Sequence, residues 1–283
     1  MVRPLILVSA LIAMMGMLTS CSSDTVDGNT SYFTNNEMIA TLEGGDQALH
    51  LMDNGGGTLM VTYDRSFPLH LNAGQKAELT TYSGNLEIPA QVAINGKTYS
   101  ITAIDAMAFS NCKTLKTVSI PETVTKFGEG AFVNCTALTS VNIPNAVTEI
   151  PSALFGQCKS VTKFVLPDGV KTIGTLAFAN CSKASTITLN EGLTEISDRA
   201  FLRCSGLREL TIPSTVTTIG PAAFLTASKL TKLHVKSTTP PVVADSLMET
   251  SYIKKSTLYV PKGSAEAYKA DASWNQFKSI TEE

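Results

Sequence analysis

A 23-residue repeat constrains the fold of this chain more than any other feature. When successive repeats are aligned, equivalent positions form columns of like residues. One column holds five cysteines, one holds six phenylalanines, one holds Ile or Phe, and one holds proline. The cysteine column is Cys112, Cys135, Cys158, Cys181 and Cys204, and the phenylalanine column is Phe109, Phe132, Phe155, Phe178, Phe201 and Phe224. A fixed period of this length predicts a solenoid, in which each repeat is one coil that packs on the next.

The unit from Leu138 to Ser160, LTSVNIPNAVTEIPSALFGQCKS, indicates how one coil folds. Alternating apolar residues predict a short strand, which proline ends, and two apolar residues then return to the core. The next three apolar residues are expected on a tight helical or 3₁₀ turn. The predicted inward set is Leu138, Val141, Ile143, Val147, Ile150, Leu154, Phe155 and Cys158. Because one coil buries little alone, the coils must stack.

Residues 1–20 are predicted to be a lipoprotein signal peptide. Arg3 precedes an apolar run that is shorter than the roughly 20 residues needed to span a bilayer, which is typical of a secretory signal. The run ends in Leu18-Thr19-Ser20-Cys21, which resembles a lipobox and implies cleavage before Cys21 and lipidation of its thiol. The alternative is an ordinary signal with a chance cysteine. Residues 21–37 are rich in Ser, Thr, Asp and Asn and are expected to form a flexible tether.

The remaining chain is divided by its turn signals. Residues 38–82 are predicted to form an N-terminal β cap with a hairpin at Asp53–Gly57, and residues 83–236 the solenoid, with a second hairpin at Asn95-Gly96. Residues 237–283 are predicted to be a C-terminal capping repeat and helix. The repeat is expected to dissolve at Thr239-Pro240-Pro241, and Ser264 to begin a helix that runs through Trp274 and Phe277.

The motif LxxVxIPxxVTxIxxxAFxxC resembles the BspA-like class of bacterial leucine-rich repeats. The resemblance covers about residues 83–283 and implies an α/β-type repeat solenoid, a right-handed coil with short parallel strands. It also implies a surface protein whose partner is a protein of a host, of the matrix or of a neighbouring cell, since some members of the class bind host or matrix proteins. It supplies no catalytic residues. This chain departs from the motif at Ala184, Asn190 and Ala227, which replace Leu, Pro and Cys.

The sequence favours no catalytic, metal or cofactor site. His50, His70 and His234 lie far apart, and no nucleophile or phosphate-loop motif is present. The net charge of −2 gives nothing that attracts nucleic acid or an anionic membrane, so a lipid anchor would be the only membrane contact. The repeated cysteines lack the close pairs that zinc sites use. In-register stacking disfavours disulfides between them, although it brings neighbours within bonding range, so a reduced, buried ladder is expected.

Two columns of residues in the predicted strands have outward side chains, and these form the candidate binding face. They are Thr117, Ser140, Lys163, Thr186, Glu209 and Lys232, and Ser119, Asn142, Val165, Thr188, Thr211 and His234. Solenoids bind partners on such extended faces, but a plain solvated sheet would have the same composition. Neither column contains an aromatic ring, so a protein partner is expected in preference to a glycan. The two functions left open are a lipid-anchored cell-surface binding or adhesion module of the outer membrane, and a structural or accessory lipoprotein that helps capture a nutrient polymer.

Overall fold

The computed structural model describes residues 37–41, 48–63 and 82–283. The predicted signal peptide, Cys21 and His70 lie outside the described residues, as do the tether up to residue 36 and parts of the predicted N-terminal cap. Glu37, which was assigned to the tether, is instead the first residue of strand β1 (Glu37–Thr41).

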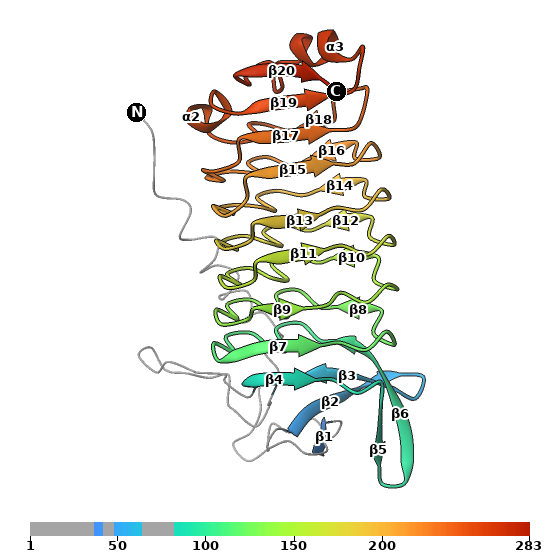
Figure 1. Ribbon diagram of the computed structural model, residues 1–283. Coiled ribbons are helices and arrows are strands. Elements are labelled where there is room, and N and C mark those ends of the chain that lie inside the picture. Colours follow the sequence, from blue (N-terminus) through green and yellow to red (C-terminus); the bar gives the residue numbers. More distant parts are fainter. Residues whose placement is uncertain (1–36, 42–47, 64–81) are drawn as a thin grey trace, which may run out of the picture. The chain divides into compact units, whose positions relative to one another are not determined.

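The repeats form a solenoid with two stacks of short parallel strands (Figure 1). We call the strands that open each repeat the front strands and the shorter strands that follow them the back strands. The front strands are β4 (Gly84–Glu87), β7 (Leu115–Ser119), β9 (Ser140–Val141), β11 (Lys163–Val165), β13 (Thr186–Thr188), β15 (Glu209–Ile212), β17 (Lys232–Val235), β19 (Thr257–Val260) and β20 (Ser279–Glu282). The back strands are β8 (Lys126–Phe127), β10 (Glu149–Ile150), β12 (Thr172–Ile173), β14 (Glu195–Ile196), β16 (Thr218–Ile219) and β18 (Val242–Val243).

The phenylalanine column forms a continuous stack of rings in the core. All six rings are fully buried, and neighbouring ring centroids lie 4.8 to 5.7 Å apart. The ring of Tyr82 extends the stack at its N-terminal end, 4.7 Å from the ring of Phe109. Offset contacts of this kind add to the stabilisation that burial of each ring gives.

The turn that carries each Phe and Cys is neither α-helical nor 3₁₀, which corrects the prediction. Two residues of each turn have positive φ, for example Ala153 at 54° and Gln157 at 63°. The turns also bond to one another, since the N–H of Phe155 donates to the carbonyl of Ala177 at 2.8 Å. A helix would direct these groups along its own axis, whereas the observed turn directs them to the neighbouring coil.

The predicted inward positions are buried, with two exceptions in the coil at Leu138. Val141 and Ile143 are only half-buried. Strand β9 ends at Val141, and the side chain of Asn142 then takes over the contact with the preceding coil: Nδ2 donates to the carbonyl of Ile120, and Oδ1 accepts from its N–H, both at 2.7 Å. The backbone therefore leaves the regular strand path early.

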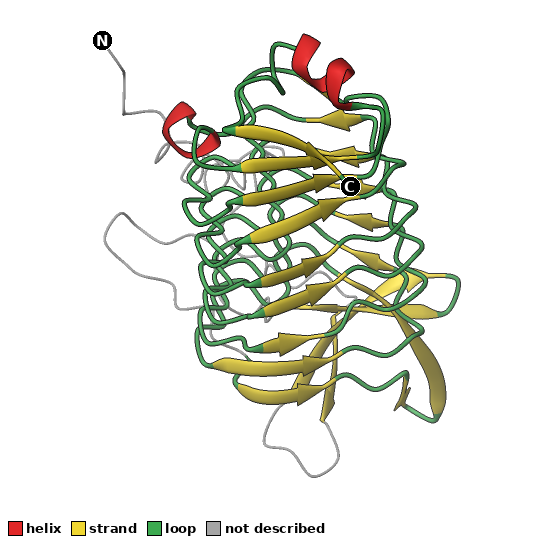
Figure 2. Ribbon diagram, turned by 45° about the horizontal axis from the view of Figure 1, so that its top comes forward, coloured by secondary structure: helices red, strands yellow, loops and turns green. Residues whose placement is uncertain are grey.

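Both hairpins form where the sequence predicts them. Strand β2 (Ala48–Gly55) pairs antiparallel with β3 (Thr58–Thr62), and β5 (Gln91–Ile94) pairs antiparallel with β6 (Lys97–Ile104). Strand β1 pairs antiparallel with β2. Strand β3 pairs parallel with β6, which in turn pairs with the first back strand, β8. The antiparallel strands thus continue directly into the solenoid (Figure 2).

The C-terminal segment differs from the prediction. The repeat does not dissolve at Thr239-Pro240-Pro241, because β18 follows at once and pairs with β16, after which a short helix, α2 (Thr250–Ile253), leads to β19. Helix α3 (Ala265–Ala270) ends before Trp274 and Phe277, and the side chain of Ser264 makes no capping hydrogen bond. The chain then forms β20, which the sequence did not predict.

The departure at Asn190 has a local explanation. The Asn190 side chain is buried, and its Nδ2 donates to the carbonyls of Asp168 and Val170 at 3.0 and 2.8 Å. The amide thereby links two successive coils at a position where the two adjacent repeats have Pro167 and Pro213.

Candidate binding face

The outward side chains of the front strands line up in register from coil to coil. Lys163 and Val165 pair with Thr186 and Thr188, and further along the stack Glu209 and Thr211 pair with Lys232 and His234. Ten of the twelve predicted face residues are exposed, whereas Thr117 and His234 are half-buried. The side chains that alternate with them along each front strand point into the core, so the outward surface of these strands consists of the columns.

The columns are longer than the sequence analysis predicted. Asn85 pairs with Thr117 in the adjacent strand, and its Oδ1 accepts a hydrogen bond from Thr117 Oγ1 at 3.0 Å. At the other end, Thr257 continues the first column, and Tyr259 follows His234 in the second. The inward alternation of Leu258 and Val260 is the sequence signal that places Tyr259 outward.

Tyr259 changes the expectation that the face has no aromatic ring. Its ring stacks on that of His234, with centroids 4.4 Å apart and an angle of 8° between the planes. One face of the tyrosine ring is therefore covered by histidine.

The sheet of front strands is interrupted at two steps. Strand β9 pairs with β7 but not with β11, and β13 pairs with β11 but not with β15. A shallow groove lies at each interruption. The groove of about 460 Å³ is lined by Thr139, Ser140, Val141, Asn142, Ile143, Asn145, Thr162, Lys163, Val165 and Pro167. The groove of about 280 Å³ is lined by Ser185, Thr186, Ile187, Thr188, Leu189, Glu209, Leu210 and Thr211.

The larger groove combines apolar and polar groups. Val165 is 49% exposed and is one of two large hydrophobic residues so exposed among the residues that the structure describes. The half-buried side chains of Val141 and Ile143 share the groove with the amides of Asn142 and Asn145. Ligand sites commonly pair an apolar surface with a few polar groups in this way.

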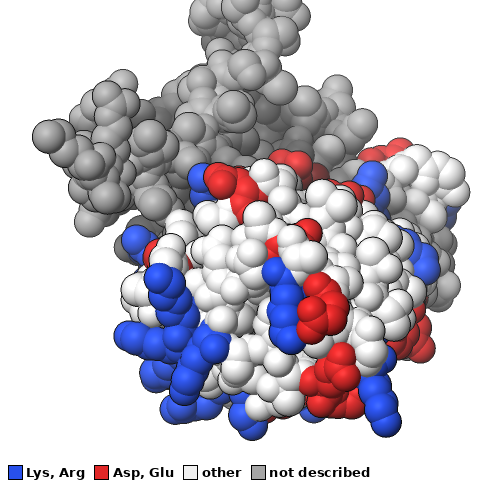
Figure 3. Space-filling view, turned by 90° about the horizontal axis from the view of Figure 1, so that it is seen from above, with Lys and Arg blue, Asp and Glu red and all other residues white. Residues whose placement is uncertain are grey.

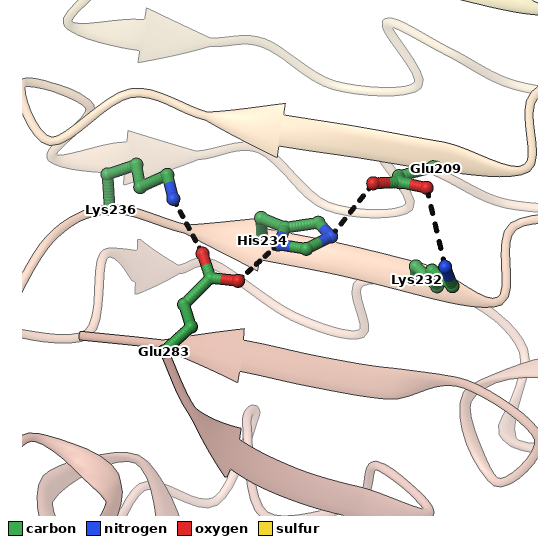
Figure 4. A network of polar contacts seen from close by, with 5 residues as sticks. All are labelled: Glu209, Lys232, His234, Lys236 and Glu283. Atoms are coloured by element: carbon green, nitrogen blue, oxygen red, sulfur yellow. Dashed lines mark hydrogen bonds and ion pairs between the residues drawn. The ribbon is translucent and has the colours of Figure 1, made fainter. Parts of the chain in front are cut away.

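The C-terminal end of the face carries a network of charged side chains (Figure 4). His234 lies between two carboxylates, with Nδ1 2.9 Å from Glu283 and Nε2 3.1 Å from Glu209. Lys236 contacts Glu283 at 2.6 Å, and Lys232 lies 3.7 Å from Glu209. The hydrogen bond from Lys236 holds the pKa of the Glu283 carboxyl below its ordinary value. These contacts connect residues of β15 and β17 with Glu283, which follows β20.

The cysteine column is buried in the core. All five thiols are free, and four of them donate to the backbone carbonyl of a phenylalanine in the preceding coil at 3.0 to 3.2 Å. Burial raises the pKa of Cys135, Cys158 and Cys181 well above the ordinary value, and that of Cys204 to about 12. The ladder thus satisfies backbone carbonyls inside the core, which the sequence pattern did not reveal.

These thiols should be unreactive in the native protein. A raised pKa leaves almost no thiolate at neutral pH, and the thiolate is the reactive form. We expect a chain that starts at Ser22 to show almost no reaction with a thiol reagent while folded, and five reactive thiols after denaturation without reductant. A count of one or three in the denatured chain would mean that disulfides form.

No helix within the described residues is long and apolar enough to cross a membrane. Among the same residues, no cluster of three or more His, Cys, Asp and Glu side chains could hold a metal ion.

Several solved structures are similar to this chain. A leucine-rich cell surface protein from Faecalibacterium prausnitzii A2-165 is 22% identical, with a TM-score of 0.52, over 86% of this chain and 72% of its own. A leucine-rich repeat protein from Bacteroides ovatus ATCC 8483 is 17% identical, with a TM-score of 0.37, over 90% and 77%. The pneumococcal vaccine antigen PcpA is 13% identical, with a TM-score of 0.36, over 87% and 98%. No curated protein matches the chain.

The family is shown by the repeat itself. The model of the BspA type leucine rich repeat region, in six copies, matches residues 91–165 and 148–259. Together these ranges cover more than half of the 283 residues, and they contain the cysteine and phenylalanine columns. The chain therefore belongs to the BspA-type leucine-rich-repeat family.

Proposed function

We propose that this chain is a non-catalytic binding module that holds a protein partner on the outward face of its front strands. The observation that carries the proposal is the interrupted strand sheet, which leaves two grooves among exposed and mostly uncharged side chains. Such a face offers hydroxyl and amide groups for hydrogen bonds, and one exposed valine for apolar contact. Solenoids of many kinds use an extended face of this sort for binding.

A protein partner fits this face better than a neutral glycan does. Neutral sugars are commonly held by stacking on aromatic rings, and the only ring in the two extended columns is Tyr259, one side of which His234 covers. A protein loop or an extended peptide can bond to hydroxyl and amide groups and place a small apolar side chain against Val165.

We further propose that the chain is anchored by a lipid and that its solenoid is capped at both ends. Lipidation at Cys21 after removal of residues 1–20 would anchor it at the outer membrane, with residues up to about 37 as a tether. The antiparallel strands before residue 83 and the segment after residue 236 would cap a right-handed coil. Protease treatment of intact cells should release the solenoid if it faces outward. Protection would favour the second function, a structural or accessory lipoprotein of the envelope.

Large charged side chains on the face should abolish binding without loss of the fold. Thr186 and Thr188 are exposed and line the smaller groove. We expect Thr186→Arg with Thr188→Arg to keep the melting temperature of the wild type, because neither side chain contacts the core. The same variant should no longer capture the protein that the wild type captures in a pull-down.

The matched control places the same substitutions away from the front strands. Thr148 and Thr218 are exposed and lie at the back strands. Thr148→Arg with Thr218→Arg adds the same charge, so it should leave capture unchanged. Full capture by the Thr186→Arg, Thr188→Arg variant would contradict the proposed site and move it to the N-terminal strands or the turns.

A further inference from the structure

One longitudinal edge of the solenoid is strongly basic. In each of six coils, five residues follow the position of the cysteine column, which runs from Cys112 to the equivalent Ala227. Together these six segments contain eight basic residues and one acidic residue, Glu209. Lys254 and Lys255 occupy the corresponding segment before β19, and Lys278 directly precedes β20. We call this set the basic ridge. It comprises Lys113, Lys116, Lys159, Lys163, Lys183, Arg208, Lys229, Lys232, Lys254, Lys255 and Lys278.

The backbone places these residues along one line parallel to the solenoid axis. The residues at the starts of the front strands bond to one another, since the carbonyl of Lys116 accepts from the N–H of Thr139 and that of Arg208 from Thr231. Successive strands in a sheet lie about 4.8 Å apart, so the ridge extends for roughly 30 Å. Seen along the axis, Lys and Arg gather over one edge of the molecule (Figure 3).

The charges of the ridge are almost all uncompensated. Every member is exposed, and Lys232, through Glu209, is the only one with an ion-pair partner among the residues that the structure describes. The opposite edge, where the front strands lead into the back strands, is mixed in charge. Its exposed side chains include the acidic residues Glu122, Glu149, Asp168, Glu191 and Glu195 and the basic residues Lys126, Lys171 and Lys236. The net charge of −2 therefore conceals one edge that is almost purely basic.

We propose that the basic ridge binds a linear anionic polysaccharide that lies along the solenoid axis. Two coils rise by about 9–10 Å, which is about the length of a disaccharide, so anionic groups on alternate sugars can meet basic side chains in every second coil. The exposed residues Thr139, Thr162, Ser185 and Thr231 directly precede four of the front strands, and their hydroxyls can bond to sugar hydroxyls. The inference goes beyond the proposed function and does not depend on a protein partner.

The composition of the ridge favours this occupant over other polyanions. Single-stranded nucleic acid is held by rings that stack on bases, and the six ridge segments from Lys113 to Lys232 contain no aromatic residue. Stable protein interfaces have an apolar centre and are depleted in lysine, whereas the ridge is nearly all lysine. Lysine binds anions as a hydrated point charge, which suits carboxylate or sulfate groups spread along a flexible chain.

The test removes four ridge lysines that are not part of the front strand face. Lys113, Lys159, Lys183 and Lys229 are exposed, and each would be changed to Gln in the full-length chain. We expect affinity for heparin and for hyaluronan oligosaccharides to fall by roughly tenfold or more, because four ion contacts and their counterion release are lost. Neutral dextran should not bind either protein, and the melting temperature should not change.

A control variant removes the same charge elsewhere. Lys97, Lys126, Lys171 and Lys262 are exposed and lie off the ridge. Their change to Gln should alter heparin affinity by less than about twofold, since interactions beyond the screening length contribute little. If the fourfold ridge variant does not fold, the pair Lys159→Gln and Lys183→Gln replaces it, with Lys126→Gln and Lys171→Gln as control.

Three results would overturn the proposal. The first is equal loss of affinity in the ridge and control variants, which would show that only net charge matters. The second is tighter binding of poly-glutamate than of the polysaccharides at the same ionic strength, which would indicate an acidic protein. The third is preferential, ridge-dependent binding of phosphatidylglycerol vesicles, which would indicate a membrane surface.

Discussion

Replacing Phe155 by alanine should lower the free energy of unfolding by about 3–5 kcal/mol, the usual range for loss of a buried ring. The Phe155 ring is fully buried at the middle of the stack, where it contacts Phe132, Phe164 and Phe178 at centroid distances of 5.6, 5.1 and 5.7 Å. Its removal therefore weakens the packing of three successive coils. Because each coil packs only on its neighbours, no other contact restores the loss.

Urea denaturation at equilibrium measures this change. The control is Thr186→Ala on the outward face, which should stay within roughly ±0.5 kcal/mol of the wild type, as surface substitutions usually do. Equal losses in the two variants would mean that the assignment of inward and outward columns is wrong.

Deletion of one complete coil should leave a folded, less stable protein. The segment from Val161 to Lys183 contains β11 and β12, and its removal joins Ser160 to Ala184. Val161 and Ala184 occupy equivalent, fully buried positions, so the new junction repeats a native one. Phe155 would then stack on Phe201 as it now stacks on Phe178. Circular dichroism should show native-like strand content and a single melting transition at lower temperature.

Deletion of about half a coil should have a much larger effect. Removing Val161 to Thr172 takes out 172 − 161 + 1 = 12 residues and destroys the period at that point. The strands and rings on the two sides can then no longer meet in register, and we expect loss of the cooperative transition. Similar melting of the two deletion variants would contradict the repeat account.

The inward columns were predictable because every coil uses the same spacing. A buried ring or strand residue must recur at 23 residues if the coils stack, so the period alone identified the phenylalanine and cysteine columns. The hairpins at Asp53–Gly57 and Asn95-Gly96 were predictable for a different reason, since their turn residues favour positive φ. Gly96 has φ of 77° and Asn95 of 52°.

Other features depend on contacts between coils and leave no periodic signal. At the interruption after β9, the side chain of Asn142 bonds to the backbone of Ile120 in the preceding coil, and no other repeat has asparagine at this position. Residues such as Gln157 adopt positive φ because bonds to the next coil hold the turn, which propensity alone does not indicate. Strand β20 is held by its pairing with β19, and its four residues, Ser279 to Glu282, are too few to give an alternating pattern on their own. The basic ridge forms because equivalent segments of successive coils lie side by side in the stack, and no single segment is strongly basic on its own.

Hydrogen exchange on the complex with the captured protein tests the central claim most directly. Backbone amides of a strand that a partner covers exchange more slowly, whereas amides elsewhere are unaffected. We expect added protection in the front strands around the two grooves, from β9 to β15, and none in the back strands β10 to β16. Protection confined to the back strands, or to the strands before residue 83, would contradict the assignment of the front strand face as the binding site.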